Sequence, residues 1–378
     1  MFSFKILKES TKSRARVGVI STPHGDIETP TFVPVATRAT VRTLDSAEVA
    51  YVGSQLLICN TYHLMITPGE KLVKKRGGIH GFMKWDRPLM TDSGGFQVYS
   101  LGFGSDHGIS KMLKEPTGET VEKHAQPKKV RITEDGVHFQ SPIDGAAHFL
   151  GPKESIRIQE ALGADMIFAF DECTSPVATK EYIHTSLEKT HRWAKECIKH
   201  KRTDQALYGI IQGGAHRDLR EESARVLGAM DFQAFAVGSE FGYDKKEMGK
   251  IMGYVSDILP KEKPRHALGV GHPADFPVLA KSGMDTFDCI APTHYARRGV
   301  IFTSKGRFDI RKSQYLKDTN PLDKSCACMV CQTYTRSYIS HLLRASELTG
   351  MKLASYHNLY FFNEQARLLR ENIKNGKL

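Results

Sequence analysis

The sequence lacks any apolar run long enough to cross a bilayer, which takes roughly 20 consecutive apolar residues. Residues 1–5 (MFSFK) also lack the charged head, apolar core and small-residue cleavage site of a secretory signal. We therefore expect a cytoplasmic protein with no membrane partner.

Cysteine is scarce and mostly scattered. There are seven cysteines, of which Cys59, Cys173, Cys197 and Cys289 lie far apart in the chain. An odd, scattered set without an export signal argues against a disulfide framework. The remaining three cysteines are clustered and need a separate explanation.

Several common catalytic motifs are absent as well. The sequence contains no P-loop, no Ser-His-Asp motif and no H-E-x-x-H motif, so these nucleotide-binding and hydrolytic sites have no support. Positive charge, by contrast, is in excess: 53 Lys and Arg stand against 42 Asp and Glu, a formal charge of +11. This surplus favours a polyanionic partner, and charge that only maintains solubility is the alternative.

Eight short apolar runs recur along the chain, each ending in polar residues or glycine. Parallel strands that are covered by helices and buried on both faces have this pattern. The intervening segments, such as 155–162, 179–200 and 219–230, carry apolar residues at helical spacing. This alternation predicts an α/β fold, an irregular (β/α)8 TIM barrel. An open doubly wound sheet is the alternative, which the absence of G-x-G-x-x-G at the first β-α turn weakens. The runs are residues 31–37, 55–60, 88–95, 165–173, 206–214, 234–240, 265–271 and 286–293.

Three stretches interrupt the alternation. Residues 4–29 predict an N-terminal hairpin with its turn at 23–25. Residues 105–129, rich in Lys, Glu, Pro, Gly and His, predict a surface loop, with an RNA contact as the sharper possibility. Residues 130–149 alternate apolar and polar positions around two Asp-Gly pairs, which are hairpin signals. The predicted division is a barrel over 1–310 with the inserted loop and hairpin at 105–150, a subdomain over 311–360 that contains the clustered cysteines, and a C-terminal helix over 361–378 that packs back on the barrel.

The clustered cysteines, Cys326, Cys328 and Cys331, bring three soft thiolates onto one tight turn. Zn²⁺ suits such ligands and takes four of them tetrahedrally in a structural site. The nearest downstream candidates for the fourth ligand are His341, in a predicted helix over 334–348, and His357, at the head of the next helix. Because a helix-long excursion lets the chain double back, we expect His357. Four protein ligands leave no open position, so one structural Zn²⁺ is the expected cofactor.

Polar side chains follow four of the apolar runs. They are Asp92, Asp171, Asp288 and Gln212. In a barrel the active site lies where the strands end, so these groups are expected on one rim. Any single aspartate there can instead cap the following helix. Two carboxylates can perform a double displacement at an anomeric carbon, one as nucleophile and one as acid/base. A carboxylate and a carboxamide can read the edge of a purine-like base.

These residues belong to longer motifs that resemble one family. The motifs are NTYHL at 60–64, DSGGFQ at 92–97, DECT at 171–174, IQGG at 211–214, LGVG at 268–271 and FDCIAPT at 287–293, in addition to the Cys326, Cys328, Cys331 and His357 set. Together they resemble the tRNA-guanine transglycosylase (queuine tRNA-ribosyltransferase) family of bacterial type, over nearly the whole chain. The resemblance implies an irregular barrel with a zinc subdomain, usually a homodimer. The implied reaction exchanges the wobble-position guanine in the anticodon loop of tRNA for a free 7-deazaguanine base, in queuosine biosynthesis or salvage.

The resemblance also implies residue roles. Asp288 matches the nucleophile that attacks the ribose anomeric carbon, and Asp92 matches the acid/base residue. The positions that bind the base are Asp92, Ser93, Gly94, Gly95, Phe96, Asp171, Gln212, Gly238 and Leu268. The positions that hold the anticodon loop are Gly269, Val270, Gly271, His272, Pro273, Ala274 and Asp275, and Thr293, His294, Tyr295, Ala296 and Arg297.

Departures from the family pattern leave two details open. Members that take the aminomethyl precursor of queuine usually carry Gly-Gly-Leu-Ala-Val-Gly-Glu where this chain has GSEFG at 238–242. The incoming base therefore stays open between that precursor and queuine, and a pocket lined by Gly242 would admit the bulkier queuine. Position 294 is His where many relatives have Arg, so a contact to a neighbouring anticodon base is weaker or pH-dependent. Two rival functions also stay open: a non-catalytic tRNA-binding partner subunit and a zinc-dependent hydrolase.

Overall fold

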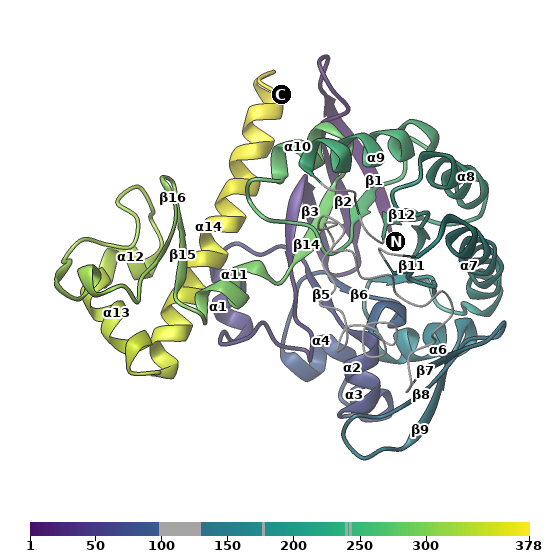
Figure 1. Cartoon of the computed structure of the whole chain (residues 1–378), viewed down its shortest axis with the longest axis horizontal. Coiled ribbons are helices and arrows are strands. Elements are labelled where there is room, and N and C mark those ends of the chain that lie inside the picture. The colour runs from purple at the N-terminus through teal and green to yellow at the C-terminus, as the bar shows by residue number, and fades with distance from the viewer. Residues whose placement is uncertain (98–129, 176–177, 239–240, 242–243) are drawn as a thin grey trace.

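The eight apolar runs form one parallel sheet that curls into a barrel (Figure 1). The computed structural model describes residues 1–97, 130–175, 178–238, 241 and 244–378. The sheet order is β4-β14-β13-β12-β11-β10-β6-β5, and a parallel bridge between Val35 and Ile58 joins its two ends. The nearly closed (β/α)8 barrel is therefore confirmed over the open sheet. The strands are β4 (Thr31–Pro34), β5 (Leu57–Cys59), β6 (Leu89–Thr91), β10 (Met166–Phe168), β11 (Ala206–Ile211), β12 (Ala234–Val237), β13 (Arg265–Ala267) and β14 (Thr286–Cys289).

Burial on both faces explains why most of these strands are largely apolar on both sides. All six residues of β11 are buried. Ala206, Tyr208 and Ile210 belong to the cluster that fills the barrel interior, whereas Leu207 and Ile211 belong to the outer cluster under the helices. Alternate side chains of a strand point to opposite faces, so a strand between two apolar layers is apolar throughout.

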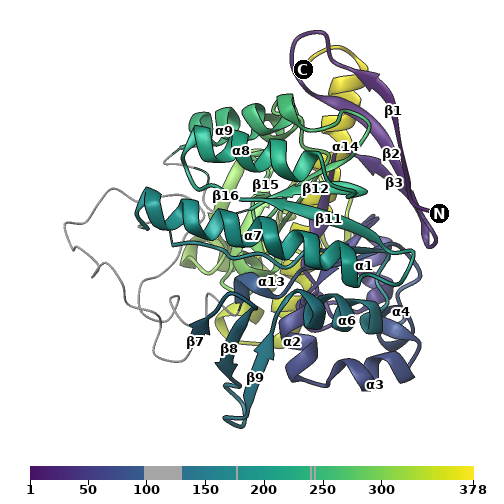
Figure 2. The same cartoon turned by 90° about the vertical axis from the view of Figure 1, so that its right-hand side faces the viewer.

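Helices cover the outer face of the barrel, as Figure 2 shows for α7 and α8. Each predicted helical segment lies on one of them; α7, for example, begins after Thr179, whose hydroxyl accepts a hydrogen bond from the Tyr182 N–H. No helix in the described part of the chain is both long and apolar enough to cross a membrane. The helices between strands are α1 (Ser46–Tyr51), α2 (Thr61–Ile66), α3 (Glu70–Lys75), α4 (Gly78–Met83), α6 (Pro152–Leu162), α7 (Lys180–His200), α8 (Arg217–Gly228), α9 (Lys245–Ile258) and α10 (Phe276–Lys281).

Two small antiparallel sheets interrupt the barrel. The first has three strands, β1 (Ser3–Glu9), β2 (Arg16–Thr22) and β3 (Gly25–Thr29), so the prediction of a single hairpin misses β1. Ile20 and Ile27 of this sheet join the interior cluster and close the N-terminal end of the barrel. The second sheet contains β7 (Val130–Ile132), β8 (Val137–Gln140) and β9 (Ala147–Leu150), with an Asp-Gly pair at each turn as predicted. The predicted loop over 105–129 lies outside the described residues.

The C-terminal part packs beside the barrel and is joined to it by one long helix, drawn in yellow in Figure 1. The elements are α11 (Ala291–Ala296), β15 (Val300–Thr303), β16 (Gly306–Asp309), the short 3₁₀ helix Ser313–Lys317, α12 (Met329–Thr333), α13 (Arg336–Arg344) and α14 (Leu348–Lys374). The predicted start of the last helix at 361 is wrong, and His357 lies inside α14 and not at a helix head. Residues 349–358 include Thr, Gly, Ser, Tyr, His and Asn, whose weak helix propensity hides the helix until packing is known.

Candidate active site and metal centre

A cavity of about 370 Å³ opens at the C-terminal ends of the barrel strands, and each of the eight strands contributes to it a residue within the strand or directly after it. Three acids predicted to meet there do so: Asp92 directly follows β6, Asp171 lies after β10, and Asp288 lies on β14. The other predicted site residues that line it are Ser93, Phe96, Gln212, Gly238, Leu268 and Gly269. The sequence placed Gly242 in this wall, and that position lies outside the described residues.

Asp92 is held by the first turn of α2. The side chain of Asn60, which caps this helix, donates to Oδ2, and the Thr61 N–H donates to Oδ1 over 3.0 Å. The Gly94 N–H donates to the same Oδ1 over 3.1 Å. Burial raises the pKa of Asp92 from 3.8 to about 7; the two backbone donors oppose this, and the charges of Asp288 and Asp171 add to it. A carboxyl with this pKa can both give and take a proton near neutrality.

Asp288 is anchored through one of its two oxygens. Its Oδ1 accepts the Gly269 N–H over 2.8 Å and lies 3.1 Å from Nε2 of His266. The other ring nitrogen of His266 lies 2.8 Å from the Thr286 hydroxyl, and the imidazole is fully buried. In the described part of the chain both hydrogen-bond contacts of this carboxylate go to Oδ1, which leaves Oδ2 available for a further contact.

Asp171 and Gln212 form a polar pair on the opposite wall. The Gln212 amide donates to Asp171 Oδ2, and the Ser93 hydroxyl donates to Oδ1 over 2.8 Å. A Cβ on Gly238 would lie 2.8 Å from Gln212 Nε2, so only glycine leaves that amide in place. A Cβ on Gly95 would lie 2.6 Å from the Asp171 carbonyl oxygen. The lack of a side chain at Gly95 and Gly238 therefore lets the backbone of this wall pack closely against Asp171 and Gln212.

Basic side chains from the end of α11 and from Arg42 gather around His294. Burial and then the charges of Arg298, Arg297 and Arg42 lower the pKa of His294. Burial, Arg42 and Arg298 lower the pKa of Arg297 in the same way. Like charges this close repel each other, which a polyanion would relieve.

The two segments predicted to hold RNA meet at Phe302, whose ring packs edge-on against His272 of one segment and Tyr295 of the other. His272, Pro273, Ala274 and Asp275 line a second cavity, of about 600 Å³, together with Val270 and Arg307. The neighbouring residues Gly269 and Gly271 pack against Asp288, through the hydrogen bond already described and a close backbone approach. Thr293 and Ala296 are buried in α11, while His294, Tyr295 and Arg297 are partly exposed.

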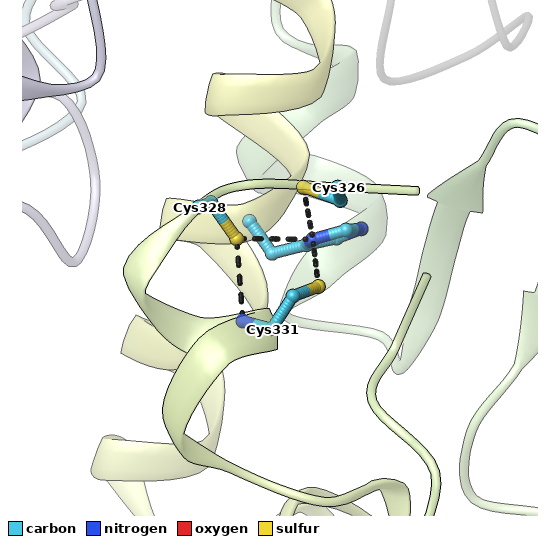
Figure 3. A group of neighbouring side chains, drawn as sticks. Cys326, Cys328 and Cys331 are labelled. Atoms are coloured by element: carbon cyan, nitrogen blue, oxygen red, sulfur yellow. Dashed lines mark hydrogen bonds between the residues drawn. The ribbon is translucent and has the colours of Figure 1, made fainter. Parts of the chain in front are cut away.

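The clustered cysteines and His357 meet in a buried group (Figure 3). The three Sγ atoms lie 3.7, 3.5 and 3.3 Å from His357 Nδ1. Tetrahedral Zn²⁺ with ordinary Zn–S and Zn–N bonds separates sulfur from nitrogen by roughly 3.6 Å. His357 Nε2 donates to the Phe302 carbonyl over 2.8 Å, which leaves the Nδ1 lone pair for a metal. These four residues can hold a metal ion, and all seven cysteines are free of disulfides.

Comparison with known proteins agrees with this geometry. The family model of queuine tRNA-ribosyltransferase matches residues 10–378. A queuine tRNA-ribosyltransferase of Halothermothrix orenii is 44% identical over 378 residues, covering 100% of this chain and 95% of the relative. That of Fusobacterium nucleatum is 44% identical over 371 residues, covering 97% and 93%. A protein of Archaeoglobus fulgidus named putative queuine tRNA-ribosyltransferase is 44% identical over 382 residues, covering 97% and 95%.

This chain belongs to the queuine tRNA-ribosyltransferase family. The family predicted from the motifs is thereby confirmed, and with it membership of the pentosyltransferase enzymes.

Several residues of this ribosyltransferase family site were not anticipated. His266 contacts Asp288 from the middle of a β-strand, where no motif marks it. Arg220 is fully buried in α8 and donates to the carbonyl oxygens of Ile211, Gly214 and Gly238, which fixes the loops that carry Gln212 and Gly238. Cys59 lines the cavity, and burial raises its pKa to about 12, so it stays a neutral thiol.

Proposed function

We propose that this protein exchanges the wobble-position guanine of tRNA for a 7-deazaguanine base through a covalent intermediate on Asp288. The observation that carries the proposal is the meeting of Asp92, Asp171 and Asp288 in one cavity at the C-terminal end of the barrel. The relatives are named for ribosyl transfer with queuine and tRNA, which supports the same reaction class.

The proposed first step is attack by Asp288 Oδ2 on C1′ of the ribose. The bond from C1′ to the guanine nitrogen breaks, and Asp92 gives its proton to the departing base. The Gly269 and His266 contacts stay on Oδ1, which becomes the carbonyl oxygen of the ribosyl ester. In the second step the incoming base loses a proton to Asp92 and displaces Asp288 from C1′. An ester that waits for a base suits exchange, whereas an activated water would end in hydrolysis.

The proposed base site uses the polar pair on the opposite wall. Asp171, Gln212 and Ser93 present hydrogen-bonding groups to the purine edge, and Phe96 stacks on its face. Gly238 leaves room beside Gln212, and Leu268 lies under the ring. The wobble nucleotide has to leave its stack to reach this depth. For the remaining predicted positions we propose the roles that the resemblance implies, namely binding the base or holding the anticodon loop.

The tRNA partner is supported by the charged mouth of the cavity. Arg42, Arg297 and Arg298 crowd around His294, and phosphates would offset their repulsion. We propose that the anticodon loop lies over α11 and over the 269–275 segment. Loop nucleotides are the ones that proteins read in RNA.

The cofactor we propose is one Zn²⁺ on Cys326, Cys328, Cys331 and His357. The thiolates and the Nδ1 lone pair fill a tetrahedron, so the ion would stabilise the fold and take no part in the exchange. A zinc-dependent hydrolase has no support from this closed ligand set.

The test is guanine displacement from tRNA that carries labelled guanine at the wobble position. The wild type should release label when queuine or its aminomethyl precursor is added, and the faster base identifies the substrate. Asp288→Ala should release none, because the nucleophile is gone. It should also form no protein–tRNA adduct on a denaturing gel, whereas the wild type forms one.

Asp144→Asn serves as the control, since Asp144 lies at an exposed turn between β8 and β9. It should match the wild type. Exchange by Asp288→Ala would remove the proposed nucleophile. A wild type that is inactive alone with both bases would support the rival function, a tRNA-binding partner subunit.

A further inference from the structure

Two histidines and an aspartate converge at the N-terminal end of the barrel, away from the catalytic cavity. His24 lies in the turn between β2 and β3, His80 lies in α4, and Asp165 directly precedes β10. His24 Nδ1 lies 2.7 Å from Asp165 Oδ1, and His80 Nε2 lies 3.4 Å from Oδ2. One ligand atom from each residue can be chosen so that all three lie within 4.8 Å of one another. Segments far apart in the sequence thus present two nitrogens and an oxygen at one point.

The carboxylate in this group is buried and pairs with no lysine or arginine in the described part of the chain. The Asp165 side chain is 1% exposed, and the two imidazoles are its only ion-pair partners within the described residues. The nearby Arg87 guanidinium is turned away, donating to the carbonyl oxygens of Ala50 and Ser54. The two imidazole rings stack with centroids 3.6 Å apart, so a proton on each would place two like charges in contact. Burying a carboxylate is costly unless a full charge offsets it.

We propose that His24, His80 and Asp165 form a second metal site, which takes a divalent first-row ion such as Zn²⁺. Two imidazoles and a carboxylate are a donor set that such ions prefer. In a tetrahedral zinc site the nitrogen and oxygen ligands are roughly 3.4 Å apart, which the His80–Asp165 distance of 3.4 Å already matches. The shorter contact to His24 requires that ring to turn, and its side chain is 40% exposed on a turn. The Arg87 carbonyl oxygen, 3.1 Å from His80 Nε2, offers a further donor.

An ion at this site would link three elements that are far apart in the sequence: the β2–β3 turn, α4 and the start of β10. Asp165 already accepts the Leu89 N–H over 2.9 Å at the start of β6, and the ion would add the β2–β3 turn and α4. Because one ligand is exposed and only three side chains contribute, this ion exchanges more readily than one held by three thiolates and a buried imidazole. It lies at the end of the barrel opposite Asp288, so it serves stability and not the exchange chemistry.

The test is a titration with Co²⁺ of protein whose cysteine site has first been filled with one equivalent of Zn²⁺. The wild type should bind one further equivalent, with the weak absorption of nitrogen and oxygen ligands and no thiolate charge-transfer band. His24→Ala and, separately, His80→Asn should weaken this second event at least tenfold. Excess Zn²⁺ should also raise the melting temperature of the wild type and not that of His24→Ala.

The matched control is His184→Ala, which removes an exposed histidine whose Nε2 lies 3.9 Å from Glu222. It should bind the second equivalent as the wild type does. Because His24 is exposed, His24→Ala should fold normally, and an unchanged melting temperature without added metal verifies this. Absence of a second equivalent in the wild type, or an undiminished one in His24→Ala, would overturn the proposal. Guanine displacement should be unaffected by His24→Ala, so this result stands apart from the proposed function.

Discussion

Burial and hydrogen bonding change the pKa of Asp92 in opposite directions. Burial dominates and raises its pKa from 3.8 to about 7. The folded state therefore holds the proton more tightly than the unfolded state does. The stability that follows is fully present below about pH 4 and is lost as the pH rises to about 7.

Asp92→Asn removes this titration. The free energy of unfolding of the variant, relative to wild type, should increase between about pH 4 and pH 7 and stay level above that. The total change is at most about 4 kcal/mol, from roughly 1.4 kcal/mol per pKa unit. Urea unfolding of both proteins across this pH range measures it, with Asp204→Asn, at an exposed position, as the comparison. A difference that does not vary with pH would contradict the raised pKa.

His266 is a positioning residue for Asp288, because it holds Oδ1 and leaves Oδ2 toward the cavity. His266→Phe should lower kcat of guanine exchange by about 10- to 100-fold, since a hydrogen bond to a charged group contributes roughly 1.5–3 kcal/mol. KM for tRNA should change little, because His266 does not face the RNA segments. His266→Gln keeps an N–H donor and should recover most of the rate. Equal loss in both variants would point to a packing role instead.

Single site residues could be predicted from the sequence only where a polar residue follows an apolar run. Asp92, Asp171, Asp288 and Gln212 were predicted because a polar residue after an apolar run is visible in the sequence. His266 and Arg220 were not, since a buried residue inside a strand or helix carries no such mark. Their importance depends on which atoms they face, and this is decided by the sheet register and by helix packing.

Helix α14 links the metal centre to the barrel. His357 is one of the proposed metal ligands, and the next residue is Asn358. The Asn358 Oδ1 accepts from the Phe302 N–H, and its Nδ2 donates to the carbonyl oxygens of Pro292 and Val300. One turn of helix thus fixes both the cysteine cluster and the end of α11. The proposed zinc and the segment proposed to hold RNA are therefore mechanically connected.

Cys328→Ala should release the metal and destabilise the C-terminal elements. The free energy of unfolding of these elements should fall by at least about 3 kcal/mol. This is less than the roughly 10–16 kcal/mol that zinc-finger peptides gain from their ion. Metal analysis, thermal unfolding and limited proteolysis of residues 311–347 measure it. Cys197→Ala is the control. It removes a buried thiol that lies outside the cluster, so this variant should keep its metal. Retained metal and unchanged melting in Cys328→Ala would rule out the ligand assignment.

Elements were predicted well where the pattern is strong. The eight strands and the Asp-Gly turns were found because apolar runs and turn residues are local signals. β1 was missed and α14 was shortened. In α14 weak helix formers are kept helical by burial of Leu353, Ala354 and Phe362 against the rest of the protein.

At the scale of the whole molecule, the charge of +11 and the basic mouth predict salt-dependent tRNA binding. The logarithm of the association constant should fall linearly with the logarithm of salt concentration. Arg297→Ala should reduce the magnitude of that slope by about 1, because one phosphate contact is lost. Binding of labelled tRNA at several salt concentrations measures this. Arg157→Ala should leave the slope unchanged, because it removes an arginine of α6 that pairs with Glu70 of α3.

The assembly and division of the chain stay predictions. A homodimer is expected from the family resemblance, and sedimentation of the purified protein tests it. The predicted boundary at 360/361 falls inside α14, so the subdomain over 311–360 and the C-terminal helix share one continuous element. The cytoplasmic location is likewise an expectation from the sequence.

By itself the sequence determined the family, the barrel and the kinds of side chain at the reactive end, because these depend on periodicity and on residues close in the chain. Only the tertiary structure decided which oxygen of Asp288 is anchored, how far burial raises the pKa of Asp92, and that His24, His80 and Asp165 meet. The reason is physical: hydrogen bonds, desolvation and ligand convergence depend on distances between atoms that the chain brings together only on folding.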